Sequence, residues 1–159
     1  MAEDQLQQLI DIEAIKELKA QYCVCVANED WDTFFTLFAE DLEFVMPQGD
    51  SFTSRSAFYD VHKISLQDPK VWGVVRCFTP IITITGSDRA KGHWAMEDVH
   101  VWPPFEGPRV GHHGYGHYHE DYIRSGRLAF QADRSDLQPG GCARGRNARR
   151  CGVVGNFTH

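Results

Sequence analysis

An apolar stripe between Leu6 and Val26 constrains the fold more than any other feature of the sequence. Its members recur at three- and four-residue steps: Leu6, Leu9, Ile10, Ala14, Ile15, Leu18, Tyr22, Cys25 and Val26. This spacing places them on one side of an α-helix, which then needs a broad apolar surface to lie against. Asp4 is a suitable N-cap, and we expect the helix to end near Asn28.

Two shorter helices and a short strand are predicted next. Asp30 is the expected N-cap of a helix from Trp31 to Phe38. Residues Leu42 to Met46 alternate weakly between apolar and polar side chains, which indicates a strand. A weaker helical pattern covers Arg55 to Leu66, with Ser54 as its cap.

From Trp72 onward the apolar period changes to two residues, which is typical of β-strands. We predict a hairpin of two long strands, 73–85 and 89–102, joined by a turn at 86–88. A third long strand is expected at 110–124, and 127–130 has the composition of a further strand start. The chain thus combines N-terminal helices with a C-terminal sheet.

Composition and charge indicate one globular domain. The chain has 159 residues, 42% of them hydrophobic, and a net charge of −6, which argues against nucleic acid as a partner. No apolar run approaches the roughly 18 residues of a membrane span, and the acidic N-terminal residues do not resemble a signal peptide. Five scattered cysteines indicate free thiols, so we expect a cytoplasmic protein.

The domain boundary is predicted near the last strand. We assign residues 1–137 to a single α+β domain. Residues 138–159 are rich in glycine and arginine and lack an apolar period. We expect this tail to be irregular or disordered.

Several histidines gather on the predicted strand 110–124. His117 and His119 share one face, with Asp121 behind them, and such a group binds a metal when a third ligand converges. The alternative is a polar, aromatic face of the sheet. Because the spacing supplies no third ligand, we predict no metal site. No phosphate loop, nucleophile elbow or CxxC pair is present, and we expect no cofactor.

Asp98 is the other candidate for chemistry. In strand 89–102 it shares a face with Trp94, Met96, His100 and Trp102. A carboxylate among apolar neighbours has to be paired, reached by solvent, or kept protonated. The sequence leaves a functional and a structural role equally open.

Three segments resemble the SnoaL-like family of the nuclear transport factor 2-like superfamily. They are the first helix with Asp30-Trp31-Asp32, the hairpin around 83–98, and the stretch Gly114 to Arg124. The resemblance covers about residues 8–124. It implies a cone-shaped, curved mixed sheet with three N-terminal helices packed on it, enclosing one mostly apolar pocket. It also implies a homodimer or homotrimer.

Within that family the pattern is most similar to bile-acid 7α-dehydratase and scytalone dehydratase-type members. These remove a proton with a histidine that an aspartate activates. The resemblance places the assisting tyrosine on Tyr22 and the acid of the W-x-x-E-D segment on Asp98. It places the aspartate of the dyad on Ala27, its histidine on or near Val75, and a second pocket tyrosine on Met46.

We therefore expect a protein that binds a small apolar, cyclic metabolite in a pocket under the first helix. As an enzyme it would be a cofactor-independent lyase (dehydratase) or isomerase. The candidate catalytic residues are Tyr22, Asp98, His100 and His117, and the candidate pocket residues are Ala27, Met46, Val75, Phe78, Trp94 and Met96. Because alanine and valine cannot transfer a proton, the alternative is a non-catalytic ligand-binding or oligomer-forming member.

Overall fold

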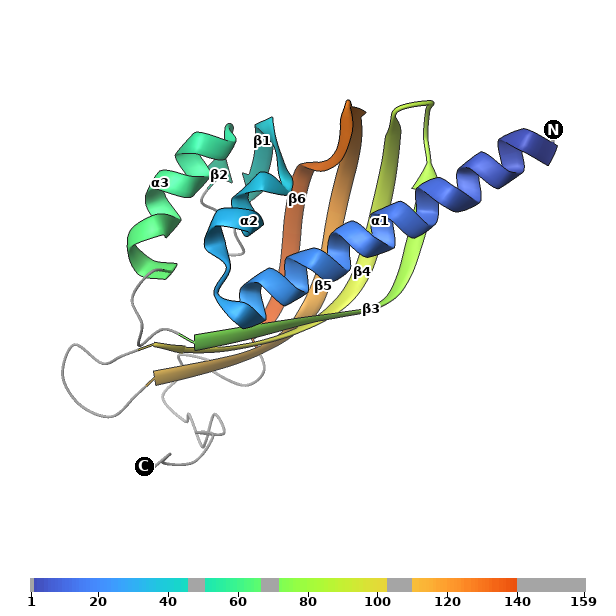
Figure 1. Cartoon of the computed structure of the whole chain (residues 1–159). Coiled ribbons are helices and arrows are strands. Elements are labelled where there is room, and N and C mark those ends of the chain that lie inside the picture. The colour runs from blue at the N-terminus through green and yellow to red at the C-terminus, as the bar shows by residue number, and fades with distance from the viewer. Residues whose placement is uncertain (1, 46–50, 67–71, 103–109, 140–159) are drawn as a thin grey trace.

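The chain folds into three helices packed on one curved, unclosed sheet (Figure 1). The computed structural model describes residues 2–45, 51–66, 72–102 and 110–139. The helices are α1 (Ala2–Asn28), α2 (Trp31–Thr36) and α3 (Arg55–Leu66). The strands are β1 (Phe38–Val45), β2 (Ser51–Phe52), β3 (Trp72–Ile84), β4 (Arg89–Trp102), β5 (Val110–Ser125) and β6 (Arg127–Pro139). The expected α+β class, with helices packed on a curved mixed sheet, is confirmed.

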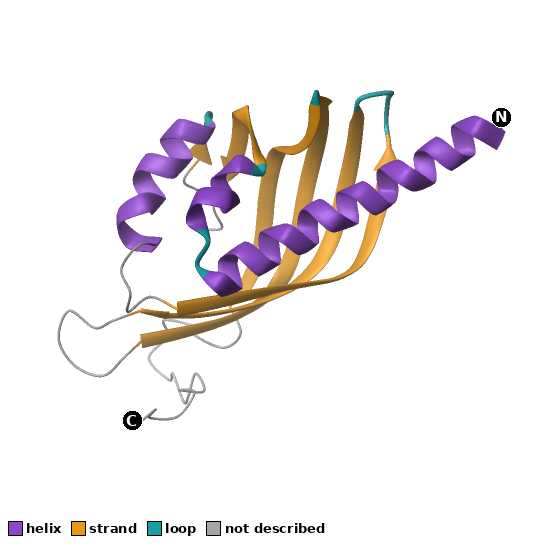
Figure 2. Cartoon of the chain, in the orientation of Figure 1, coloured by secondary structure: helices purple, strands orange, loops and turns teal. Residues whose placement is uncertain are grey.

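The sheet has the strand order β2-β1-β6-β5-β4-β3, and Figure 2 shows the strands on one side of the helices. β1 runs parallel to β6, and the other described pairs are antiparallel, so the sheet is mixed. The turn between β5 and β6 is closed by Gly126, whose φ of 79° is a left-handed conformation that glycine adopts without steric cost. A bulge in β3 follows Phe78, where Thr79 has a φ of 43°.

Several element boundaries differ from the sequence prediction; for example, β1 begins at Phe38 rather than at Leu42. α2 ends at Thr36, two residues before the predicted end, because Phe38 already pairs with Phe130 in the sheet. β6 extends from Arg127 to Pro139, far beyond the four residues with a visible strand pattern, because it lies between β5 and β1 and pairs with both. The predicted boundary at residue 137 stays a prediction, since residues 140–159 lie outside the described structure.

α1 lies diagonally across the sheet, and Figure 1 shows its N-terminal turns projecting past the strands. Its buried side chains begin at Asp11 and recur at helical spacing through Ile15, Leu18, Lys19, Tyr22, Cys25 and Val26. The first part of the predicted stripe, Leu6, Leu9 and Ile10, is exposed because it lies ahead of the part of the helix that packs on the sheet. None of the helices in the described part of the chain combines the length and the apolar composition of a membrane span.

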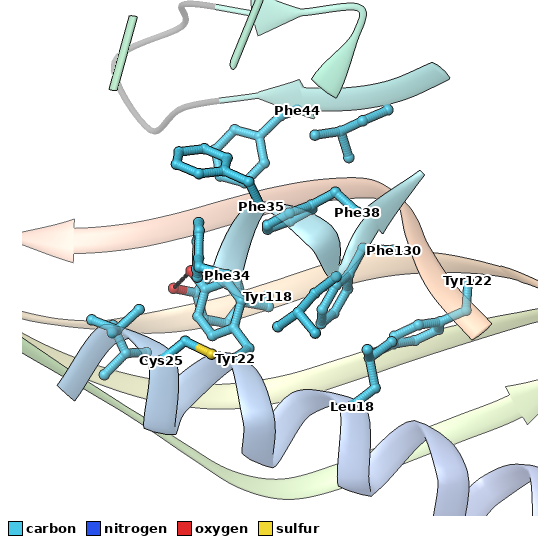
Figure 3. Close-up of a cluster of buried hydrophobic side chains, with 14 of the residues drawn as sticks. Leu18, Tyr22, Cys25, Phe34, Phe35, Phe38, Phe44, Tyr118, Tyr122 and Phe130 are labelled. Carbon is cyan, nitrogen blue, oxygen red and sulfur yellow. Dashed lines mark hydrogen bonds between the residues drawn. The ribbon is translucent and has the colours of Figure 1, made fainter. Parts of the chain in front are cut away.

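Aromatic rings fill the space between the helices and the sheet (Figure 3). Phe38 of β1 and Phe130 of β6 are completely buried, with ring centroids 5.3 Å apart. Phe58 of α3 stacks on Phe44 of β1 at 4.4 Å, which attaches the third helix to the sheet. Such rings each bury a large apolar area and make geometrically specific contacts, so this cluster is a main source of stability.

We predict that Phe130→Ala lowers the free energy of unfolding by about 3–5 kcal/mol, because it leaves a cavity at the centre of the aromatic cluster. The measurement is chemical denaturation followed by circular dichroism. Phe78→Ala is the matched control, since the Phe78 side chain is 45% exposed and its loss should cost about 1 kcal/mol or less. Equal losses in the two variants would contradict a central position for β6.

Candidate functional site

The face of β3, β4 and β5 that α1 covers, here called the inner face, carries every second residue of each strand. In β4 these residues are Ala90, Gly92, Trp94, Met96, Asp98 and His100. In β5 they are Gly114, Gly116, Tyr118, Glu120 and Tyr122, and in β3 they include Gly73, Val75 and Cys77. The alternation predicted from the sequence for strand 89–102 is confirmed.

Asp98 and His100 form a hydrogen-bonded pair on the inner face. Asp98 is 5% exposed, and its Oδ2 lies 3.2 Å from Nδ1 of the half-buried His100. Because a carboxylate accepts hydrogen bonds, Nδ1 is the protonated nitrogen in this contact. The pair therefore holds the imidazole in one tautomer and one orientation.

Small residues on the neighbouring strands make room for this pair. Asp98 lies across from Val75 on β3 and Gly114 on β5. Gly73 lies across from His100, and a Cβ added at Gly73 would be 2.5 Å from Cδ2 of the imidazole. Such a contact is too short for real atoms, so the observed position of the ring depends on glycine at this position.

A second polar group is buried further along the sheet. Lys19 of α1 is 1% exposed and forms an ion pair with Glu120 of β5, which is 3% exposed. The Tyr122 hydroxyl donates to the other oxygen of Glu120, and Nε1 of Trp94 donates to Tyr122 at 2.9 Å. A Cβ at Gly92 would lie 2.8 Å from the Tyr122 ring, so this network also needs a glycine beside it.

The Lys19 ammonium is surrounded by aromatic rings as well as by its carboxylate. Its Nζ lies 3.6 Å from the ring centroid of Tyr118 and 4.2 Å from that of Tyr22. The two tyrosine hydroxyls are 3.4 Å apart, and Figure 3 shows them facing each other. Cation–π contacts and the carboxylate together compensate for the loss of water around the lysine.

The structure places the other predicted pocket residues on different surfaces. Val75, Trp94 and Met96 are buried on the inner face. Phe78 lies on the opposite, outer face, across from Ala95. Met46 lies outside the described residues.

Ala27 and His117 do not join the Asp98–His100 pair on the inner face. Ala27 is exposed near the end of α1, because five residues beyond Tyr22 correspond to a rotation of roughly 140° about the helix. His117 is exposed on the outer face, because odd-numbered residues of β5 point away from the helices. Its ring stacks on that of His93, with centroids 4.8 Å apart. Within the described residues no cluster of potential ligands is arranged to hold a metal ion.

The buried residues Lys19, Tyr118, Glu120 and Tyr122 were missed as candidates at the sequence level. The signal was present, because Lys19 falls on the apolar stripe, four residues after Ile15. The two-residue period likewise places Glu120 on one strand face with two tyrosines. A charged residue at an apolar position of each element indicates a buried pair.

Two clefts lie away from the inner-face pair. One lies between α1 and the β3–β4 turn, where Arg124 donates to Asp11 at 2.9 Å and keeps the pKa of that carboxyl below its usual value. Its volume of about 20 Å³ admits little more than water. The other is an open cleft of about 540 Å³ with a charged lining that includes Glu43, Arg89 and Lys91. The first cleft is too small for a metabolite, and the charged lining of the second does not suit an apolar one.

We predict that Glu120→Gln lowers the free energy of unfolding by about 3–5 kcal/mol, because the buried Lys19 ammonium loses its anionic partner. Urea denaturation at neutral pH measures this loss. Glu13→Gln is the matched control: it removes the same charge from the exposed Lys16–Glu13 pair and should cost less than about 1 kcal/mol. A loss in Glu120→Gln no larger than in the control would show that the buried pair does not hold α1 in place.

Comparison with known proteins identifies one matching family model and several solved structures of similar fold. Residues 7–131 match the model of the SnoaL-like domain. A protein provisionally named scytalone dehydratase, from Novosphingobium aromaticivorans, has a similar structure, with a TM-score of 0.72 and 16% identity over 82% of this chain and 86% of that chain. A hexachlorocyclohexane dehydrochlorinase is similar with a TM-score of 0.71 and 13% identity, covering 84% and 89% of the two chains.

The same fold also occurs in a protein that is one subunit of a larger enzyme. The beta subunit of benzoate 1,2-dioxygenase from Burkholderia mallei is similar with a TM-score of 0.62 and 12% identity, covering 78% of this chain and 88% of that chain. At such identities these structures show a common fold rather than a common activity. The family model, however, extends from α1 into β6 and covers most of the chain. The protein therefore belongs to the SnoaL-like family, within the nuclear transport factor 2-like fold.

Proposed function

We propose that this protein binds a small, largely apolar cyclic molecule against the inner face and removes a proton from it, as a cofactor-independent lyase or isomerase. The observation that carries the proposal is the buried Asp98 carboxylate bonded to Nδ1 of His100 at 3.2 Å. Both side chains come from one strand and are held by their neighbours. This is the arrangement that a general base requires before substrate arrives.

The tautomer of His100 determines which of its ring nitrogens can exchange a proton with the substrate. With Nδ1–H donating to Asp98, the imidazole exchanges a proton with a substrate through Nε2. The carboxylate stabilises the imidazolium that forms, as an orienting aspartate does in other acid–base sites. A lyase then expels a leaving group from the carbanion, and an isomerase returns the proton elsewhere.

In this proposal, Asp98 and His100 take the roles of the aspartate and histidine that the family's dyad would supply. The resemblance places the family histidine at Val75, and Val75 lies directly across from Asp98 in the sheet. The proposed base is therefore one strand away, on β4. The family aspartate corresponds to Ala27, which is exposed, so the pairing carboxylate also comes from β4.

The proposed class of substrate follows from the inner-face side chains around the Asp98–His100 pair. Val75 and Met96 are apolar side chains next to the pair, and Trp94 continues the apolar inner face along β4, which suits a ring system. The hydroxyls of Tyr22 and Tyr118 supply hydrogen bonds for a substrate oxygen. A cyclic ketone or hydroxy ketone fits these groups. The names of two similar structures, a dehydratase and a dehydrochlorinase, also describe eliminations.

The alternative is a non-catalytic member that binds the same class of molecule or forms oligomers. It is favoured by the alanine and valine at the dyad positions and by exposed apolar side chains on the outer face, among them Phe78 and Tyr115. Binding of cyclic ketones without any proton exchange in the wild-type protein would establish this alternative.

We predict that the protein exchanges the α-protons of bicyclic ketones, such as decalones, for deuterium in D₂O, and that Asp98→Asn lowers this rate by about 100-fold or more. Asparagine keeps the volume of the side chain and removes its charge. NMR measures both the exchange and the binding of the ketone. His117→Ala, on the outer face, is the control and should exchange at the wild-type rate. An exchange rate in Asp98→Asn equal to that of the wild-type protein would exclude the proposed role of Asp98 in proton transfer.

We predict that Gly73→Ala lowers the same exchange rate by about tenfold or more, because the added methyl group displaces the imidazole of His100 from its productive geometry. Gly86→Ala is the matched control, since a Cβ there lies 3.7 Å from its nearest neighbour. The readout is exchange rate at saturating ketone, together with the melting temperature of each variant. Equal rates in both variants would show that the position of His100 does not matter.

A further inference from the structure

We propose that Cys23 of α1 and Cys77 of β3 form a reversible modification site, a dithiol that organic hydroperoxides or hydrogen peroxide oxidise to a disulfide. This inference does not depend on the proposed enzymatic function. It rests on the placement of two thiols that lie 54 residues apart in the chain and meet where the helix crosses the sheet.

The two sulfurs are in van der Waals contact but are not bonded. The two Sγ atoms are 3.7 Å apart, and both residues are half-buried free thiols. A disulfide has an S–S length of about 2.0 Å, so the sulfurs must approach by roughly 1.7 Å. The two thiols belong to facing elements, so this approach requires rotation of the two side chains or a shift of α1 toward β3.

The surroundings give the two thiols different roles. The hydrogen bond with Cys77 lowers the pKa of Cys23, and the positive charge of Lys19, one helical turn earlier, acts in the same direction. Burial and the negative charge of Glu120 oppose this shift without reversing it. The same hydrogen bond raises the pKa of Cys77. Cys25 is buried, and burial raises its pKa. Since the thiolate is the reactive form and Cys23 lies one helical turn from the Lys19 ammonium, we assign Cys23 as the nucleophile and Cys77 as the resolving thiol.

The reaction balances without any bound cofactor. The Cys23 thiolate attacks one peroxide oxygen, the O–O bond breaks, and the released alkoxide takes a proton to become an alcohol, or water when hydrogen peroxide is the oxidant. Cys23 is now a sulfenic acid. The Cys77 sulfur attacks the Cys23 sulfur, the S–S bond forms, and the hydroxyl group leaves as water with the Cys77 proton. Two thiols are oxidised and one peroxide is reduced.

The crosslink would form next to the inner-face pair. Cys77 lies across from Met96, and Val75, the preceding inner-face residue of β3, lies across from Asp98. Oxidation therefore ties α1 to β3 beside the buried carboxylate and removes the freedom of the helix to move away from the sheet.

The experiment uses the full chain carrying Cys142→Ser and Cys151→Ser, which leaves Cys23, Cys25 and Cys77 in place. The folded protein is treated with a few equivalents of hydrogen peroxide at neutral pH, then alkylated, digested and analysed by mass spectrometry. We expect a linked Cys23–Cys77 peptide, lighter by two hydrogen atoms and released by dithiothreitol. We also expect a higher melting temperature for the oxidised form, because the crosslink restricts the unfolded chain.

Single variants in this background assign the roles. Cys77→Ser should stop at a Cys23 sulfenic acid that dimedone traps, whereas Cys25→Ser, the matched control, should form the disulfide at the rate of the parent. Folding of each variant is checked by its melting curve, and the linked peptide is read in the parent itself. A peroxide-treated parent with no Cys23–Cys77 link, or with Cys25 in the link, would overturn the proposal.

Discussion

The buried ion pair between Lys19 and Glu120 determines how α1 lies on the sheet. Both side chains are withdrawn from water, which is costly unless every charge finds a partner. The Tyr122 hydroxyl and the flanking aromatic rings complete that environment. Sliding the helix by one turn would leave both charges buried and unpaired, so the pair selects one register among the many that an apolar stripe alone would accept.

The other contacts of α1 depend on this register. Toward the N terminus Asp11 meets Arg124, and toward the C terminus Tyr22 meets Tyr118 and Cys23 meets Cys77. Each contact joins a polar group of the helix to one of the sheet. Apolar burial thus supplies most of the stability, whereas these polar contacts supply the specificity of the arrangement.

The inner face is shaped as much by missing side chains as by present ones. Gly73 admits the imidazole of His100, and Gly92 admits the ring of Tyr122. Two polar groups, the Asp98–His100 pair and the Lys19–Glu120 network, therefore lie on the same apolar surface. The resemblance places the family's acid–base dyad on α1 and β3, whereas the pair proposed for this role here comes from β4.

The sequence by itself determined the fold class, the three helices, the long strands and the face on which Asp98 and His100 meet, because helical and strand periods are local properties of the chain. It did not reveal the length of β6. The residues of this strand after Phe130 have no strand pattern in the sequence and are ordered by pairing with β1 and β5. Nor did it show that Lys19 meets Glu120 or that Ala27 and His117 point away from the inner face. Those facts depend on how the helix is rotated and where it crosses the strands, which only the tertiary packing decides.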